Sequence, residues 1–413
     1  MITFGTILAL FIEWIVEREP YRSNGLHNIE GRTSKLIKLI QNVYVFRDNQ
    51  WKMSEILIAD QKIEAIADRI PINYKDLVVI DGEGMKAIPG YIDQHVHVCG
   101  GGGEGSFITQ VPPLKFSEPV KAGVTTLVGL LGTDGTTRSV ANLVAKTKAL
   151  KEFGLTAYCL TGNYNYPSPT LTGSVMDDIV FVEEIIGVKI AIADHRSANM
   201  TTESLIKLAS DARVAGMLSG KPGIVHLHTG SGKNPLNIIF DALEKSEIPI
   251  SNFRPTHLAP KYEHALKFAE MGGYVDFTCD PDDMYNRAGL LCRALDEVPE
   301  GMMTISTDSN GSLPVWNEKN EMIGITAASI SALHATIKAM VEMHHCPLEK
   351  AIKPVTENVA KALKLYPAKG TLKTGADADI VLLDDELNID SVYAMGKCML
   401  KSGAMQVSVN FEF

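Results

Sequence analysis

Two histidines separated by a single residue, His95 and His97, lie in the apolar run of residues 91–98. This run predicts a β-strand, and alternate residues of a strand share one face, so both imidazoles are expected to point into the same space. That arrangement would chelate a metal ion. By itself the spacing is equally consistent with two histidines of an ordinary core.

Three further metal-ligand residues stand at the ends of other predicted strands. Counted along the chain from the strand of residues 91–98, His228 ends the fifth predicted strand, His257 the sixth and Asp308 the eighth. Each comes just before a loop. Imidazole nitrogens and carboxylate oxygens are typical ligands of zinc. The convergence of five such residues at strand ends therefore predicts a metal centre.

Lys189 lies in the apolar strand sequence GVKIAIAD, where an unpaired ammonium group would be costly to bury. Burial lowers a lysine pKa, and a neutral amine can react with carbon dioxide to form a carbamate that bridges two cations. The structural alternative is a lysine paired with a buried acid. Beside four strand-end histidines, the carbamate is the favoured interpretation.

The strands that must position these residues alternate with helical segments. Eight apolar runs follow Pro89-Gly90, and this alternation is typical of an α/β protein with a (β/α)8 TIM barrel. Barrel enzymes carry their catalytic groups at the C-terminal ends of the strands, where the predicted ligands stand. The runs are residues 91–98, 125–132, 156–162, 188–194, 223–230, 253–259, 273–279 and 302–308.

Both ends of the chain read as short β-strands separated by turns. We expect residues 35–90 and 369–413 to form one small β-sandwich-like domain, and residues 91–368 to form the catalytic barrel. Residues 29–32 spell IEGR, a protease site that is often placed in expression vectors. Residues 1–34 are therefore interpreted as vector-derived or as an over-long start.

Composition narrows the class of protein further. The 413 residues carry a formal net charge of −10 and no run of Lys or Arg, which argues against a nucleic-acid partner. The apolar stretch of residues 7–16 contains Glu13 and is too short to span a bilayer, so no membrane association is expected. Six cysteines without CxxC spacing favour reduced thiols and a cytoplasmic location.

Several motifs closely resemble those of the isoaspartyl (β-aspartyl) dipeptidases of the amidohydrolase superfamily. They are PGYIDQHVHVCGGGGE, GLLGTD, LTGNYNYPS, IGVKIAIADHRSA, GKPG, PTH and STDSNGS, and the resemblance extends from Lys35 to the C-terminus. It implies two zinc ions per chain, bridged by carboxylated Lys189 and hydroxide. His95, His97 and Asp308 would hold one ion, and His228 and His257 the other. The family also implies a homo-oligomer, with an octamer suspected.

The resemblance further implies hydrolysis of the isopeptide bond of β-aspartyl dipeptides. Zinc-activated hydroxide would be the nucleophile, and Asp308 would take its proton and pass it to the leaving amine. Tyr164 would stabilise the oxyanion. A tyrosine in a loop is otherwise usually a packing residue.

Four residues match the family positions that bind the dipeptide. Glu104, after four glycines, would pair with the substrate ammonium group, and Arg196 would bind a carboxylate in a bidentate manner. Thr133 and Ser312 would add hydrogen bonds. The structural alternatives are a plain flexible turn at the glycines and a surface ion pair at the arginine.

One departure from the family leaves the substrate open. After His257 the family usually carries an asparagine and then an arginine that contacts the substrate carboxylate, whereas this chain reads Leu258-Ala259-Pro260-Lys261. A lysine cannot reproduce the guanidinium fork. The alternative is an amidohydrolase acting on another N-acyl amino acid or a cyclic amide. A non-catalytic binding module is disfavoured because all six ligand residues are present.

Overall fold

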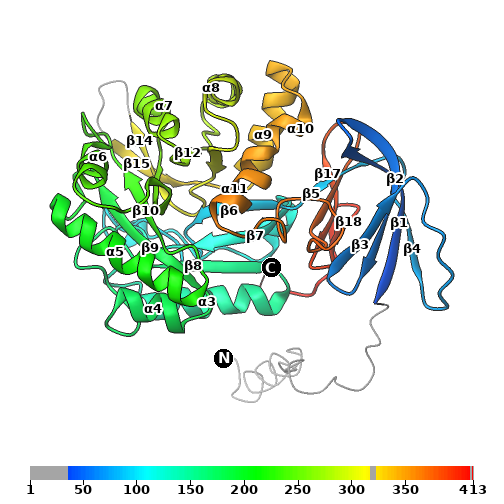
Figure 1. Cartoon of the computed structure of the whole chain (residues 1–413), viewed down its shortest axis with the longest axis horizontal. Coiled ribbons are helices and arrows are strands. Elements are labelled where there is room, and N and C mark those ends of the chain that lie inside the picture. Colours follow the sequence, from blue (N-terminus) through cyan, green and yellow to red (C-terminus); the bar gives the residue numbers. More distant parts are fainter. Residues whose placement is uncertain (1–35, 317–321, 410–411, 413) are drawn as a thin grey trace, which may run out of the picture.

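The computed structural model describes residues 36–316, 322–409 and 412, so the interpretation of residues 1–34 falls outside the described chain (Figure 1). A barrel of parallel strands lies beside a smaller β domain (Figure 1). The predicted (β/α)8 fold is confirmed. Each of the eight predicted runs overlaps a barrel strand, and β7 and β9 begin one and three residues before their runs. The strands are β6 (Tyr91–Val96), β7 (Val124–Gly129), β8 (Thr156–Gly162), β9 (Ile185–Ile192), β10 (Ile224–Thr229), β11 (Phe253–Thr256), β12 (Val275–Thr278) and β13 (Met303–Ser306).

Six of these strands form one parallel sheet from β6 to β11, and β12 pairs with β13. Two backbone hydrogen bonds link the sets and close the ring: Leu258 N donates to Asp276 O at 3.3 Å, and His97 N donates to Ser309 O at 2.8 Å. Every residue of β6, β7, β9 and β10 is buried, as expected for strands covered on both faces.

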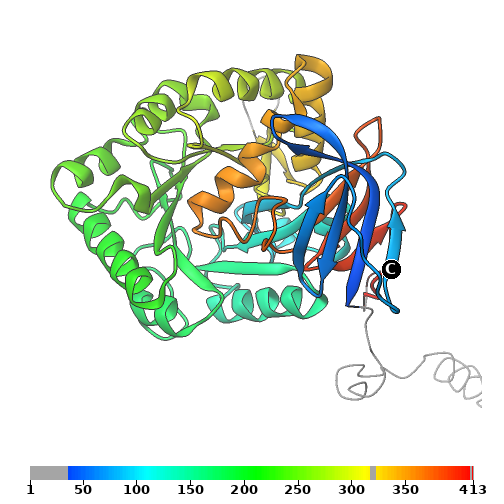
Figure 2. The same cartoon turned by 45° about the vertical axis from the view of Figure 1, so that its right-hand side comes forward.

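Helices surround the strands on the outside of the barrel (Figure 2). The long helices α3 and α5 each begin at a hydroxyl side chain that accepts a hydrogen bond from the first turn, Ser139 and Thr201, and each ends at a left-handed glycine. The described helices are α2 (Ser117–Lys121), α3 (Val140–Phe153), α4 (Val175–Phe181), α5 (Thr202–Ser219), α6 (Asn237–Glu244), α7 (Tyr262–Glu270), α8 (Met284–Glu297), α9 (Ala332–His344), α10 (Leu348–Ala351) and α11 (Glu357–Ala362). A hairpin of β14 (Ser312–Trp316) and β15 (Met322–Ala327) follows β13.

The β domain joins the two ends of the chain in one sheet (Figure 2). Its N-terminal strands are β1 (Ile37–Arg47), β2 (Gln50–Ala59), β3 (Lys62–Ala67), β4 (Val78–Asp81) and β5 (Lys86–Pro89); its C-terminal strands are β16 (Ile380–Leu383), β17 (Ile389–Ala394), β18 (Lys397–Lys401) and β19 (Ala404–Met405). β5 pairs antiparallel with β16, and this pair unites the two segments. Apolar residues from both segments, including Ile56 and Ile380, share one core.

A buried lysine lies where the barrel meets this domain. Lys369 Nζ lies 2.6 Å from Asp379 Oδ2 and 2.9 Å from Asp377 Oδ2, and it donates to Thr156 Oγ1 of β8 at 2.7 Å. Its side chain is 5% exposed. A buried ammonium group that is paired and hydrogen-bonded in this way is a structural feature.

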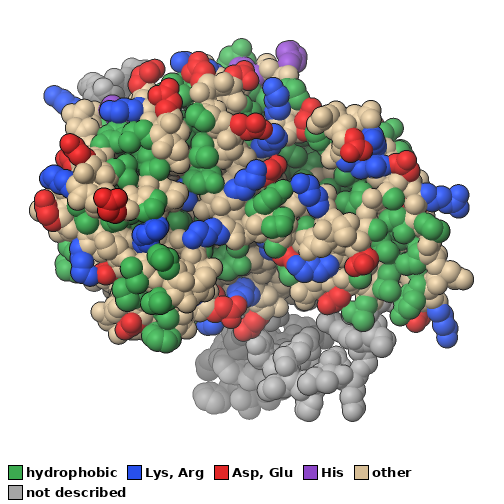
Figure 3. All heavy atoms as spheres, viewed as in Figure 1, with side chains coloured by type: hydrophobic (Ala, Val, Ile, Leu, Met, Phe, Trp, Pro, Cys, Tyr) green, Lys and Arg blue, Asp and Glu red, His purple; other side chains and the backbone are tan. Residues whose placement is uncertain are grey.

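Acidic and basic side chains are interspersed on the face drawn in Figure 3. Within the described ranges, no helix has both the length and the apolar character needed to cross a membrane.

Candidate active site

The six predicted metal ligands meet at one end of the barrel. His95 and Lys189 lie within β6 and β9, and His228 lies in β10. The other three ligands, His97, His257 and Asp308, directly follow or come shortly after the ends of β6, β11 and β13. Because parallel strands bring their C-terminal ends to the same edge, residues far apart in the sequence share this space.

Asp308 lies at the centre of the ligand set. Its Oδ1 lies 2.9 Å from His97 Nε2 and 3.1 Å from His95 Nε2, and its Oδ2 lies 3.9 Å from His257 Nε2. Burial alone would raise the pKa of Asp308, but the charge of His95 and hydrogen bonds from His95 and His97 hold the pKa well below its usual value. The carboxylate is therefore ionised and acts as an acceptor.

Strained backbone presents two of these ligands. His257 has a φ of 64° and Asp308 a φ of 56°, a left-handed conformation that residues with a Cβ seldom adopt. A Cβ on Gly311 would lie 2.8 Å from Asp308 Oδ1, so glycine is required beside the carboxylate. Strain of this kind is concentrated at functional sites.

Lys189 has no acidic partner among the residues that the structure describes. It is fully buried, and its Nζ lies 3.4 Å from His95 Nε2. Burial lowers its pKa to about 7, with the nearby carboxylates of Asp308 and Asp276 acting in the opposite direction. The acid pair that was the structural alternative is therefore not found, while carboxylation of Lys189 stays a prediction.

The donor atoms fit a metal ion. His257 Nε2 and His97 Nδ1 are buried and have no hydrogen-bond partner in the described structure, which is costly for a polar atom unless another group binds it. Ligand atoms of His95, His257 and Asp308 lie within 4.8 Å of one another. A set of imidazole nitrogens with one carboxylate is typical of zinc.

Side chains behind the histidines fix their orientation, as is common in metal sites. His226 Nε2 lies 3.1 Å from His95 Nδ1, and Thr278 Oγ1 lies 2.7 Å from His257 Nδ1. Neither of these partners was predicted from the sequence. His226 had a detectable signal, because its spacing from His228 repeats that of the His95 pair, whereas nothing in the sequence marked Thr278.

His228 is held on both ring nitrogens. Tyr164 Oη lies 2.7 Å from Nδ1, and Asp194 Oδ2 lies 2.8 Å from Nε2, so a metal ion would have to replace one of the two contacts. Burial raises the pKa of Tyr164 well above its usual value, which keeps the phenol a hydrogen-bond donor. Asp194 lies in the IGVKIAIADHRSA motif, but the sequence alone predicted no role for it.

The four predicted substrate-binding residues also come together. Glu104 Oε1 accepts hydrogen bonds from Arg196 Nη1 at 2.9 Å, Ser312 Oγ at 2.9 Å and Thr133 Oγ1 at 3.2 Å. We call Glu104, Thr133, Arg196 and Ser312 the clamp. Arg196 also binds Asp194 through Nε at 3.0 Å and Nη2 at 2.9 Å, so Asp194 connects the clamp to His228.

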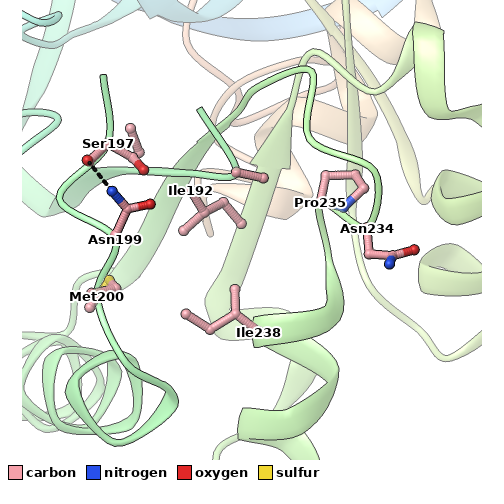
Figure 4. Close-up of a pocket in the computed structure, with 9 residues that line it drawn as sticks. Ile192, Ser197, Asn199, Met200, Asn234, Pro235 and Ile238 are labelled. Carbon is pink, nitrogen blue, oxygen red and sulfur yellow. Dashed lines mark hydrogen bonds between the residues drawn. The ribbon is translucent and has the colours of Figure 1, made fainter. Parts of the chain in front are cut away.

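Lys261 lies outside this arrangement. It ends the short helix Ala259–Lys261, and within the described chain its side chain makes no hydrogen bond or ion pair. A pocket of about 320 Å³ is lined by residues such as Ile192, Met200 and Ile238 (Figure 4). None of the predicted site residues lines it, but Ser197, the residue after Arg196, does.

The family model described as Amidohydrolase family matches residues 87–399. A solved β-aspartyl dipeptidase from Fervidobacterium islandicum AW-1, in complex with β-Asp-Leu dipeptide, is 40% identical to the chain. The match covers 91% of this chain and 99% of that one, with a TM-score of 0.86. A dihydropyrimidinase from Brevibacillus agri shares the fold at 18% identity, 90% and 96% coverage and a TM-score of 0.63.

Curated relatives are more distant. An adenine deaminase from Oceanobacillus iheyensis is 23% identical over 395 residues, which covers 90% of this chain and 58% of that protein. The human N-acetylglucosamine-6-phosphate deacetylase is 29% identical over 122 residues, 26% of this chain and 30% of that protein. The chain thus spans less than two thirds of these relatives. The extent of the family match and the 40% identity over nearly a whole solved chain place the protein in the amidohydrolase family, in the group of the β-aspartyl dipeptidases.

Proposed function

We propose that this protein is a binuclear zinc hydrolase that cleaves the isopeptide bond of β-aspartyl dipeptides. One observation carries the proposal: a buried set of metal-ligand side chains and a clamp with one acid and one guanidinium group occupy the same barrel mouth. The metal-ligand side chains suit hydrolysis of an amide. The clamp suits a small substrate that carries both a positive and a negative charge. The Fervidobacterium relative, whose structure contains β-Asp-Leu, supports the choice of substrate.

His95, His97 and Asp308 would hold one zinc ion, His228 and His257 the other, and carboxylated Lys189 would join them. When bound, the zinc ions supply positive charge that lowers the pKa of water and polarises the scissile carbonyl. The lowered pKa of Lys189 provides the neutral amine that carbamate formation requires.

Asp308 and Tyr164 are suited to the proton and charge transfers of this reaction. Asp308 is ionised and lies at the ligand set, so it can take a proton from the attacking water and give it to the leaving amine. Tyr164 is a buried, protonated phenol and can donate a hydrogen bond to the developing oxyanion.

The clamp provides recognition at the two charges of the substrate. Glu104 is ionised, because hydrogen bonds and the charge of Arg196 lower its pKa despite burial, and it suits an α-ammonium group. Arg196 is fixed from behind by Asp194 and suits a carboxylate. N-acyl amino acids and cyclic amides lack the ammonium group, so an acid in the clamp favours dipeptides over them.

The test is turnover of β-Asp-Leu by the purified protein, with zinc content measured on the same preparation. We expect cleavage to aspartate and leucine at about two zinc ions per chain. A panel of N-acyl amino acids and cyclic amides is the control. Turnover of a panel member without turnover of β-Asp-Leu would reject the dipeptide and retain the amidohydrolase. The homo-oligomer and the cytoplasmic location stay predictions.

A further inference from the structure

In the structure, which contains no substrate, the two charged residues of the clamp, Glu104 and Arg196, bind each other. The Nη1 of Arg196 lies 2.9 Å from Glu104 Oε1, and the same oxygen accepts from Ser312 and Thr133. The side chains of Arg196 and Glu104 are 26% and 19% exposed. A ligand that takes the place of Arg196 at Glu104 Oε1, or of Glu104 at Arg196 Nη1, therefore separates a partly buried ion pair.

Arg196 does not depend on Glu104 for its position. Its Nε and Nη2 bind Asp194, whose side chain is only 7% exposed and also contacts His228. Nη1 alone reaches Glu104. If Glu104 turned away or lost its charge, the guanidinium group would therefore stay in place with Nη1 free.

Ligands of different charge meet this pair differently. A ligand with an ammonium and a carboxylate group compensates both residues of the separated ion pair. Its ammonium group binds Glu104 and its carboxylate binds Arg196. A ligand with only carboxylates satisfies Arg196 but leaves the Glu104 carboxylate unpaired beside an anion, which is unfavourable at a partly desolvated site.

We propose that the Glu104–Arg196 ion pair excludes anionic ligands that lack an ammonium group, so that Glu104 sets specificity by rejection as well as by attraction. The proposal rests on the proposed function for the identity of the substrate. It extends that function, because a glutamate that only contacts the ammonium group would leave the binding of simple anions unchanged.

L-Aspartate and succinate test this inference, because they share both carboxylates and differ only in the ammonium group. Their Kd values are measured by calorimetry on the zinc-loaded wild type, Glu104→Gln, Glu104→Ala and the control Glu244→Gln, which changes an exposed acid of α6. In wild type we expect aspartate to bind about tenfold tighter than succinate. In both Glu104 variants we expect succinate to bind about fivefold tighter than in wild type, and aspartate about tenfold weaker.

Succinate affinity in the Glu104 variants that equals or falls below that of wild type would overturn the inference, as would failure of wild type to bind aspartate. Zinc content and Tm must match those of Glu244→Gln. The measurement needs no turnover. If β-Asp-Leu is not cleaved but the affinities change as expected, only the proposed reaction fails; if it is cleaved and succinate affinity is unchanged, only the exclusion of anions fails.

Discussion

Two lysines are buried among the residues that the structure describes, and their surroundings differ. Lys369, where the barrel meets the β domain, lies within 3 Å of Asp377 and Asp379, and these carboxylates raise its pKa against the effect of burial. Lys189, in the centre of the barrel, contacts His95 and has no acid at ion-pair distance among the described residues; burial lowers its pKa to about 7.

The difference separates a lysine that keeps its proton from one whose pKa is lowered. A paired ammonium group keeps its proton and stabilises the fold, whereas an unpaired one in an apolar strand tends to become a neutral amine. A similar contrast holds for other atoms at the barrel centre, since His257 Nε2 and His97 Nδ1 have no hydrogen-bond partner in the described structure. Polar atoms at the barrel centre thus lack protein partners among the described residues, whereas the ammonium group at the junction is paired.

The largest effect is expected at Lys189. Lys189→Ala should lose at least one zinc ion per chain and nearly all activity, because the bridging group is removed. Short-chain carboxylic acids should restore part of the rate by supplying the missing carboxylate. Metal analysis and rate measurement with and without added acid check this prediction. Wild-type zinc content and rate in the variant would place Lys189 in the same structural class as Lys369.

Asp308→Ala tests whether the carboxylate beside His95 and His97 serves chemistry. We expect a loss of roughly three orders of magnitude or more in kcat, since ligand and proton shuttle are lost together. The fold should survive, as judged by circular dichroism. A kcat within tenfold of wild type would contradict the role of Asp308.

Lys369→Met tests the role of the buried lysine between the barrel and the β domain. Removing the ammonium group leaves two buried carboxylates close together, so the free energy of unfolding should fall by about 3–5 kcal/mol. Urea denaturation measures this change. Zinc content and kcat of the folded variant should equal those of wild type; a selective loss of zinc would mean that the junction and the metal site are coupled.

Smaller effects are expected at the clamp. Arg196→Lys should lower kcat/KM for β-Asp-Leu by roughly tenfold, since a bidentate charged contact contributes about 1.5–3 kcal/mol. Lys261→Ala is the matched control and should change kcat/KM by less than about twofold, because its ammonium group has no partner at the site. If Arg196→Lys leaves kcat/KM unchanged and Lys261→Ala abolishes activity, carboxylate recognition would be assigned to the opposite side of the barrel.

The sequence by itself determined the barrel and most of the site. Apolar runs alternating with helical segments gave all eight strands, because periodicity and strand-end chemistry are local properties. For the same reason the places of these residues in the runs were enough to predict the candidate metal ligands His95, His97, His228, His257, Asp308 and Lys189.

Only the tertiary structure decided which side chains support the predicted metal ligands. His226, Thr278 and Asp194 contact ligands that lie far away along the chain, and such contacts depend on how the barrel closes. The structure also separated Lys189 from Lys369, because the proximity of an acid to a buried amine is set by packing between distant segments. Likewise, the ion pair between Glu104 and Arg196 joins two loops that are 92 residues apart in the sequence, and only folding brings them together.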